Sequence, residues 1–256
     1  MMILRRAAWT WTVAAFVLGA CGTRPPQVTQ TAAAPRETTI SLTFDDGDAD
    51  NFGSVAVLRQ YGLHATWYIP SGLVGTPGYM SWDQLETLRA DGNEIGGHSV
   101  HHVGLDTLDS EGLRREVCGS REELAAHGFA AASFAYPFGG YNAEVKQTVR
   151  ECGFASARTI GAGPEDIPPP DPFALRAYPY IVSDTSFSKL RRYVSDMRNQ
   201  GGGWMILIFH HVCDGCDNFS VRPDVLSTFI EWLSSEQAQG RLKVGTVGEI
   251  VQEGRP

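Results

Sequence analysis

Strand-like and helix-like segments alternate along this chain beyond residue 37. The strand-like segments are short and rich in β-branched and aromatic residues, and they fall at 39–44, 65–69, 93–96, 133–136, 154–159, 204–209 and 242–244. Helical patterns lie between them, at 52–61, 81–90, 111–126, 143–151, 186–199 and 223–234, with a last helix after residue 244. This alternation predicts a single α/β domain built on a parallel sheet, either an open sheet or a barrel.

Unusual polar or backbone features follow four of the predicted strands. In chain order they are Asp45 with Asp46, His98 with His102, Pro137-Phe138-Gly139, and His210. The carboxyl ends of parallel strands lie at one edge of a sheet or one mouth of a barrel, where the active sites of such folds are assembled. We therefore expect these residues to lie close together.

The sequence HSVHH at 98–102 is typical of a divalent metal site. His98 and His102 are four residues apart, which places both imidazoles on one side of a helical turn, and a nearby carboxylate would complete a common ligand set. His101 is three residues from His98, so the spacing alone leaves the register open by one position. Histidines that are exposed or bonded within the core are the alternative interpretation.

Two adjacent carboxylates in TFDDG, at 43–47, raise an electrostatic question. Asp45 and Asp46 should repel each other at the end of a buried strand unless a cation binds one of them. A metal ion on one carboxylate would leave the other free to act as a base. The alternative is a loop turn closed by an Asx-type hydrogen bond, which Gly47 would accommodate.

Length and charge limit the classes of partner. The chain has 256 residues, enough for one large domain or two small ones with a real core. It carries 21 Lys and Arg against 29 Asp and Glu, and no basic run is interleaved with aromatic residues. Nucleic acid is therefore not an expected partner.

The N-terminal 37 residues are expected to lie outside the folded domain. Residues 1–20 have a signal-peptide pattern, in which Arg5 and Arg6 precede an uncharged apolar run too short for an ordinary membrane span. Its end, LGAC, resembles a bacterial lipobox, which implies cleavage before Cys21 and lipid attachment to that cysteine. Residues 21–37 are rich in Pro, Thr and Ala and predict a flexible tether, followed by a catalytic domain at 38–256.

These features predict an exported protein that is anchored by lipid to a bacterial membrane or envelope. An ordinary signal peptide, and hence a secreted protein, is the alternative. Export favours disulfides, and we expect one between Cys118 and Cys152 and another between Cys213 and Cys216. Reduced thiols are the main alternative, since CDGC at 213–216 has the context of neither a redox motif nor a zinc knuckle.

The motifs TFDDG, HSVHH, YPFG and LIFH resemble, in order and spacing, those of the polysaccharide deacetylase family (NodB homology, carbohydrate esterase family 4 type). The similarity extends over about residues 38–252. It implies a distorted (β/α) barrel of about seven parallel strands that binds one divalent metal, usually Zn²⁺ and sometimes Co²⁺ or another ion.

The resemblance also implies separate roles for the motif residues. Metal binding is implied for Asp46, His98 and His102. Asp45 matches the catalytic base, His210 the catalytic acid, and Phe138 the position whose backbone N–H contacts the oxyanion. Leu105 stands where the family pattern has a leucine, which supports His102 over His101 as the ligand.

One family feature is missing from the third motif. An arginine that orients the base usually begins this motif, where the present chain has Ala135. Arg158 or Arg176 could supply the guanidinium from another strand, and we expect Arg176. Tyr141 and Trp82 are candidates for stacking on sugar rings, with ordinary packing as the alternative.

The function implied by the resemblance is hydrolysis of N-acetyl groups on an envelope or extracellular polysaccharide, such as peptidoglycan, a chitin-type glycan or an exopolysaccharide, with release of acetate. Two alternatives stay open. One is an O-acetyl esterase acting on an acetylated glycan such as xylan, and the other is a non-catalytic carbohydrate-binding envelope protein of the same fold. We expect a glycan partner, membrane contact through the lipid anchor only, and a monomer.

Overall fold

The computed structural model describes residues 36–161, 163–178 and 180–254. The strands are β1 (Thr38–Phe44), β2 (Thr66–Ile69), β3 (Glu94–Gly97), β4 (Ser133–Ala135), β5 (Ser156–Arg158), β6 (Gly203–Phe209), β7 (His211–Val212), β8 (Ser220–Val221) and β9 (Lys243–Val244). The helices are α1 (Ser54–Tyr61), α2 (Trp82–Ala90), α3 (Ser110–Ala126), α4 (Ala143–Glu151), α5 (Phe187–Asn199), α6 (Pro223–Ala238) and α7 (Val247–Glu253). Short 3-10 helices lie at Ala49–Gly53, Ser71–Leu73, Leu105–Thr107 and Pro137–Gly139.

Some of the predictions concern residues that the structure does not describe. The signal peptide at 1–20, the lipidation site Cys21 and the tether up to residue 35 lie outside the described residues. Within the described ranges, no helix combines the length and the apolar character that a membrane span requires.

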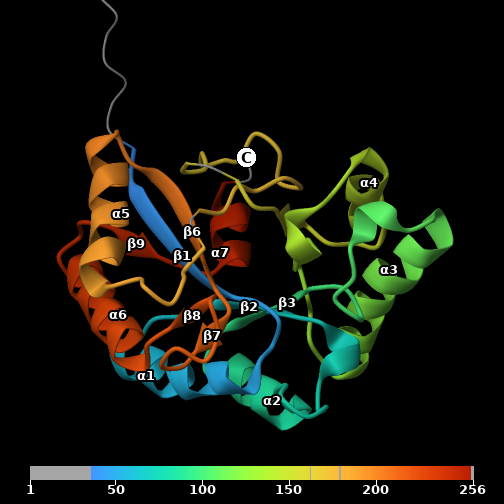
Figure 1. Cartoon of the computed structure of the whole chain (residues 1–256). Coiled ribbons are helices and arrows are strands. Elements are labelled where there is room, and N and C mark those ends of the chain that lie inside the picture. Colours follow the sequence, from blue (N-terminus) through green and yellow to red (C-terminus); the bar gives the residue numbers. More distant parts are fainter. Residues whose placement is uncertain (1–35, 162, 179, 255–256) are drawn as a thin grey trace, which may run out of the picture. The chain divides into compact units, whose positions relative to one another are not determined.

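The main sheet is parallel throughout and has the strand order β5-β4-β3-β2-β1-β6, with β9 paired to β1. β1 pairs with β6 along its full length, and all seven residues of β1 are buried. Figure 1 shows these two strands side by side, with helices packed around the curled sheet. The predicted distorted (β/α) barrel is thereby confirmed.

An irregular segment, residues 173–178 and 180–181, lies between the two outer strands of the sheet. The backbone N–H of Leu175 donates to the Ala157 carbonyl of β5 at 2.9 Å, and the N–H of Tyr178 donates to the Ile206 carbonyl of β6 at 3.0 Å. The segment therefore links β5 to β6 and brings the ends of the curled sheet together. No strand is predicted for these residues from the sequence.

Local signals in the sequence set the bounds of individual elements. The side chain of Ser81 accepts a hydrogen bond from the Gln84 backbone N–H, and the Gln84 side chain accepts one from the Ser81 N–H. This capping box satisfies two backbone donors that have no partner within α2, and it starts the helix where the sequence predicted.

The core is built from aromatic and aliphatic side chains of the strands. Phe44 at the end of β1 stacks on Trp67 of β2 with ring centroids 4.3 Å apart, and it lies 5.3 Å from the ring of Phe209. All three side chains are fully buried. Their burial fixes the ends of β1 and β6, and hence the positions of the polar residues that follow them.

Two disulfides among the described residues lie outside the sheet. Cys118 of α3 is bonded to Cys152 at the end of α4, and Cys213 is bonded to Cys216 in the loop between β7 and β8. This is the pairing that the sequence analysis favoured. The first bond joins two neighbouring helices, whereas the second closes a short turn in the loop that carries Phe219.

Candidate active site

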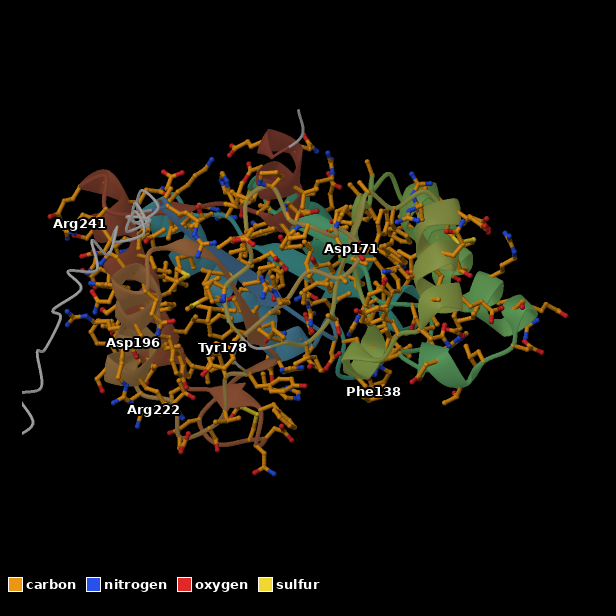
Figure 2. All side chains as sticks on the ribbon, turned by 90° about the horizontal axis from the view of Figure 1, so that it is seen from above. Phe138, Asp171, Tyr178, Asp196, Arg222 and Arg241 are labelled. Carbon is orange, nitrogen blue, oxygen red and sulfur yellow. A yellow bond between two sulfur atoms is a disulfide. The ribbon has the colours of Figure 1, made fainter. Side chains whose placement is uncertain are left out.

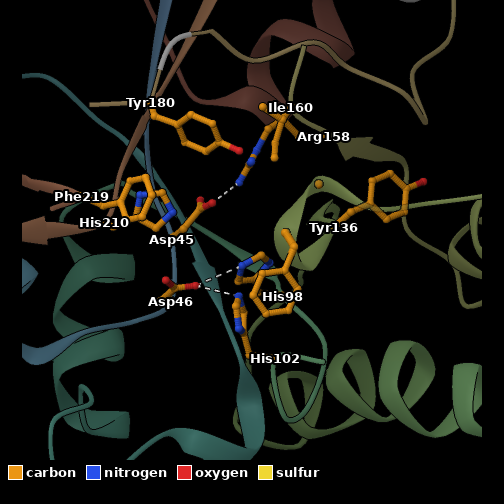
Figure 3. Close-up of a pocket in the computed structure, with 12 residues that line it drawn as sticks. Asp45, Asp46, His98, His102, Tyr136, Arg158, Ile160, Tyr180, His210 and Phe219 are labelled. Carbon is orange, nitrogen blue, oxygen red and sulfur yellow. Dashed lines mark hydrogen bonds and ion pairs between the residues drawn. The ribbon is translucent and has the colours of Figure 1, made fainter. Parts of the chain in front are cut away.

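The polar residues that follow the strands converge on one cavity of about 350 Å³. Six of the predicted site residues line it: Asp45, Asp46, His98, His102, Phe138 and His210. The remaining lining residues include Arg158 at the end of β5 and the side chains of Tyr180 and Phe219 (Figure 3). The cavity thus lies at the carboxyl ends of the parallel strands, as the sequence predicted.

A carboxylate and two imidazoles meet at one side of the cavity. Asp46 Oδ1 lies 3.3 Å from His98 Nε2 and 3.1 Å from His102 Nε2. His98 Nδ1 lies 2.8 Å from the Ala135 carbonyl oxygen, to which it donates in the tautomer that leaves Nε2 with a free lone pair. Such a backbone acceptor behind the ring is the usual way in which a metal-binding histidine is oriented.

The three side chains fit a divalent metal. Asp46 Oδ1 is buried and has no hydrogen-bond partner of suitable geometry among the described residues. The three ligand atoms lie within 4.8 Å of one another. Burial by itself would raise the pKa of Asp46, but the imidazoles of His102 and His98 lower the pKa below its ordinary value, so the carboxylate is ionised. One carboxylate oxygen and two imidazole nitrogens are ligands that suit zinc and similar ions.

The loop at 98–102 is held by a carboxylate from α3. Glu116 Oε2 accepts the backbone N–H groups of Val100 at 3.0 Å and of His101 at 2.9 Å, and Glu116 Oε1 lies 2.8 Å from His101 Nδ1. His101 is therefore paired with Glu116, away from the cluster of Asp46, His98 and His102. Burial would raise the pKa of Glu116, but these bonds to His101 and Val100 lower it.

The backbone around the cavity adopts an uncommon conformation. Four non-glycine residues have positive φ in the described part of the chain: Asp46 at 66°, Ser99 at 63°, His102 at 55° and Phe138 at 58°. Three of them line the cavity, and Ser99 follows a fourth lining residue. Left-handed conformations cost energy for side chains other than glycine and cluster at functional sites. Their concentration here supports a functional role for this cavity.

The arginine that lies beside Asp45 is Arg158, and not Arg176 as predicted. The guanidinium of Arg158 is paired with Asp45 Oδ2, and both side chains are almost fully buried. Arg176 instead donates to Glu165, through its backbone N–H at 2.9 Å and its guanidinium at 2.9 Å. Because the guanidinium of Arg176 is paired with Glu165, its charge lies outside the cavity.

The second oxygen of Asp45 is left free. Oδ1 is buried and has no hydrogen-bond partner among the residues that the structure describes. Figure 3 shows the carboxylate between Arg158 and His210, separated from the cluster around Asp46. The two adjacent acids therefore have different surroundings, one beside a guanidinium and the other beside two imidazoles.

His210 closes the cavity on the side of β6. Its ring lies 5.5 Å from the ring of Phe219 and 6.3 Å from that of Tyr180. Burial lowers the pKa of His210 below 6.5, since the opposing effect of Asp45 and Asp46 is smaller. Its Nδ1 is buried without a hydrogen-bond partner among the described residues.

The two predicted sugar-stacking residues do not line the cavity. Trp82 stacks on His127 with ring centroids 3.6 Å apart and packs against the core, an arrangement that fits the alternative of ordinary packing. Tyr141 stacks on Tyr136, a lining residue, with ring centroids 4.9 Å apart. The aromatic lining comes instead from Tyr136, Phe138, Tyr180 and Phe219.

Sequence reasoning missed some of these residues for different reasons. Arg158 lies near the end of the predicted strand at 154–159. Since site residues are expected at the carboxyl ends of the strands, this position would have favoured Arg158 over Arg176. Tyr180 lies in the segment that links β5 to β6, and Phe219 lies in the loop that follows β7. Neither segment has a periodic pattern that points to the cavity.

Comparisons with known proteins agree with this geometry. A family model described as "Polysaccharide deacetylase" matches residues 32–157. The chain is similar to the peptidoglycan-N-acetylglucosamine deacetylase of Bacillus cereus, with 26% identity over 120 residues, and to the chitooligosaccharide deacetylase of Rhizobium leguminosarum bv. trifolii, with 29% identity over 109 residues. These matches cover 46% and 41% of this chain and 54% and 49% of the relatives, so the chain spans about half the length of each relative.

A solved structure agrees over more of the chain. The crystal structure of a Mycobacterium smegmatis protein assigned as a polysaccharide deacetylase has a TM-score of 0.67 and 17% sequence identity. The likeness covers 88% of this chain and 94% of that one. At this level of identity it demonstrates a shared fold.

Proposed function

Since this chain belongs to the polysaccharide deacetylase family, we propose that it is a metal-dependent hydrolase that removes N-acetyl groups from an envelope or extracellular polysaccharide and releases acetate. The observation that carries the proposal is the arrangement around the cavity. A cluster of Asp46, His98 and His102 lies next to Asp45 with its arginine partner, and His210 faces both.

We assign metal binding to Asp46, His98 and His102, with Zn²⁺ as the first candidate and Co²⁺ or another divalent ion as alternatives. When bound, such an ion supplies a Lewis acid that polarises the acetamide carbonyl and lowers the pKa of a water molecule. The backbone acceptor behind His98 fixes that ring, and the Glu116 bonds fix the loop that ends in His102.

Asp45 is the proposed general base. Its Oδ2 is paired with Arg158, which holds the carboxylate in one orientation. Its Oδ1 has no partner among the described residues, so one oxygen is available to accept the proton of the attacking water. Arg158 therefore positions Asp45 without needing to touch the substrate.

His210 is the proposed general acid. It lines the cavity beside Asp45, where a departing amine nitrogen would meet it (Figure 3). Burial lowers the pKa of His210, and a lower pKa makes the protonated ring a stronger acid toward that nitrogen. The backbone N–H of Phe138 is the proposed donor to the developing oxyanion, at a residue whose left-handed conformation turns its peptide at the edge of the cavity.

The apolar lining provides space for the sugar and its acetyl methyl group. Ile160, Tyr180 and Phe219 contribute apolar surface beside the polar residues, and Phe138 exposes 68% of its surface at the entrance. Aromatic faces of this kind pack against the apolar face of a sugar ring.

Access to an envelope or extracellular polysaccharide requires export. The signal-peptide pattern at 1–20 and the lipobox ending in Cys21 support a lipid anchor on a bacterial membrane. The relatives named above act, by their names, on peptidoglycan and on chitooligosaccharides, both of which are N-acetylated glycans.

The proposal is tested by acetate release from peptidoglycan, N-acetylglucosamine oligomers, an N-acetylated exopolysaccharide and acetylated xylan, with bound metal measured in parallel. We expect acetate from at least one N-acetylated glycan and little from xylan. Release from xylan alone would make the protein an O-acetyl esterase, and no release from any glycan would contradict the proposal.

The assigned roles are separated by two variants. Asp45→Asn should keep the bound metal and lower kcat by roughly 10²–10⁴-fold, since it removes only the base. Asp46→Ala should lose both the metal and the activity. Equal loss of metal in the two variants would contradict the assignment of Asp45 as the base, and full metal content in Asp46→Ala would contradict the ligand set.

A further inference from the structure

A second groove lies beside β6, between α5 and residues 163, 164 and 178, which precede α5 in the chain. It has a volume of about 350 Å³ and is lined by Pro164, Tyr178, Tyr193, Asp196, Gln200 and Met205, among others. We call it the Tyr178 groove. None of its lining residues lines the catalytic cavity.

One wall of the Tyr178 groove comes from a single face of α5. Tyr193 and Asp196 are three residues apart in the helix, and Gln200 caps its C-terminal end. This spacing places the three side chains on one side of the helix. Asp196 and Gln200 are exposed, and their side chains form no hydrogen bond with another described residue.

The opposite wall carries an exposed aromatic ring. Tyr178 is 41% exposed, and its ring lies 6.0 Å from that of Tyr193 in an edge-on arrangement. A ring face that is open to solvent, with a free carboxylate and a free amide nearby, suits a sugar. The ring packs on the apolar face of a pyranose, and the polar groups accept and donate hydrogen bonds to hydroxyl groups.

The Tyr178 groove is joined to the catalytic cavity through one short segment. Tyr180, two residues further along the chain, lines the cavity and is 39% exposed. Both tyrosines lie beside β6, because the N–H of Tyr178 donates to the Ile206 carbonyl and Tyr180 is bridged to Ile208. In Figure 2, Tyr178 lies between Asp196 on one side and Phe138 on the other.

We propose that the Tyr178 groove is a binding subsite for sugar units of the same polysaccharide chain whose acetamide group occupies the catalytic cavity. This inference rests on the proposed function, since it takes a polymeric substrate as its premise. The units next to the reacting sugar must lie on the surface around the cavity, and the Tyr178 groove offers an aromatic face and free polar groups there. Binding remote units would hold the chain in position and favour long substrates over short ones.

The test compares a hexamer with a dimer of N-acetylglucosamine in wild-type protein and in Tyr178→Ala. The ratio of kcat/KM for the hexamer to that for the dimer should fall roughly threefold to tenfold in the variant, because one aromatic contact is lost. Tyr178→Phe should keep most of the ratio, since it retains the ring face. Asp196→Ala provides a second variant, and its ratio should fall as well.

Tyr61→Ala is the matched control, because this half-buried tyrosine at the end of α1 lines neither the cavity nor the groove. Thermal unfolding of each variant checks that it is folded. An unchanged ratio in Tyr178→Ala, or a ratio that falls equally in Tyr61→Ala, would overturn the proposal.

A binding measurement separates this proposal from the proposed function. Calorimetric titration of the hexamer into Asp45→Asn and into Asp45→Asn with Tyr178→Ala measures binding without turnover. Weaker binding in the double variant supports the subsite even if acetate release fails, whereas equal affinity overturns the subsite even if the wild-type protein is an active deacetylase.

Discussion

The two adjacent aspartates of the site are distinguished by their neighbours. Asp45 is paired with a buried guanidinium, and Asp46 is placed between two imidazoles. A positive or metal-binding group stands beside each acid and offsets the repulsion between the two adjacent carboxylates. The partners of these two carboxylates therefore differ, and they come from positions that are distant in the sequence.

Arg158 offers a direct test of how the base is positioned. Arg158→Lys keeps a positive charge but loses the planar fork that holds Asp45, so kcat should fall about 10–100-fold with a smaller change in KM. Arg176→Lys is the matched control, because Arg176 is also paired with a carboxylate but lies outside the cavity. Steady-state rates of acetate release give kcat and KM for both variants. An equal decrease in kcat in the two variants would contradict the positioning role of Arg158.

Glu116 is predicted to influence metal binding without being a ligand. Glu116→Gln keeps the size of the side chain but removes the charge that holds two backbone N–H groups of the loop before His102. Metal affinity, measured by competition with a chelator, should fall about 10–100-fold. Glu122→Gln, at an exposed position of the same helix, should leave the affinity unchanged. A loss of equal size in Glu122→Gln would exclude a specific role for Glu116.

The pKa of Glu116 adds a pH signature. Because the pKa is lower in the folded state than the ordinary 4.5, the stabilisation by its carboxylate is fully present above pH 4.5 and is lost as the pH falls through the folded-state pKa. The difference in unfolding free energy between wild type and Glu116→Gln should therefore be largest above pH 4.5 and shrink in more acidic solution. Urea unfolding at several pH values would measure it, and a difference that grows toward acid would contradict the assignment.

At the level of elements, the loops and helices around the sheet are held by long-range bonds. α3 supplies Glu116 to the metal loop and is itself joined to α4 by the Cys118–Cys152 disulfide. The loop after β7 supplies Phe219 to the cavity and contains the Cys213–Cys216 disulfide. The two bonds close loops of very different length, and their effects on stability should differ accordingly.

Removal of the first disulfide is expected to be costly. Replacing Cys118 and Cys152 by serine should lower the free energy of unfolding by roughly 3–4 kcal/mol on the chain-entropy model. Replacing Cys213 and Cys216 should lower it by less, since the loop between them has two residues. Denaturant unfolding of both double variants measures the difference. A larger loss from the second pair would show that loop length does not decide the effect.

For the molecule as a whole, metal binding should be coupled to stability. Zn²⁺ that binds the native state alone adds about 2.7 kcal/mol at a free concentration 100 times its Kd. For a domain of this size, each kcal/mol raises Tm by about 2–4 °C. Thermal unfolding of metal-free protein with added Zn²⁺ should show this rise in wild type and in Asp45→Asn, and no rise in Asp46→Ala. An equal rise in Asp46→Ala would place the ion elsewhere.

Much of the fold and half of the cavity were accessible from local sequence patterns. Alternating strand and helix segments gave the parallel α/β class, and the position of Asp45, Asp46 and the histidines after strands placed them at one end of the sheet. These inferences succeed because they depend on local properties of each segment: the periodicity of its apolar residues, its helix-capping residues and the position of a residue at the end of a strand.

The partners of these residues were decided only by the tertiary structure. Arg158 rather than Arg176 meets Asp45, because Glu165 pairs with Arg176 and the end of β5 faces the cavity. Trp82 packs against His127, while Tyr180 and Phe219 reach the cavity from segments without a periodic pattern. Which side chains meet depends on how the sheet curls and how its outer strands are linked, and both are set by packing between residues far apart in the chain. The sequence thus determined the candidate chemical groups, and the tertiary packing determined which of them meet.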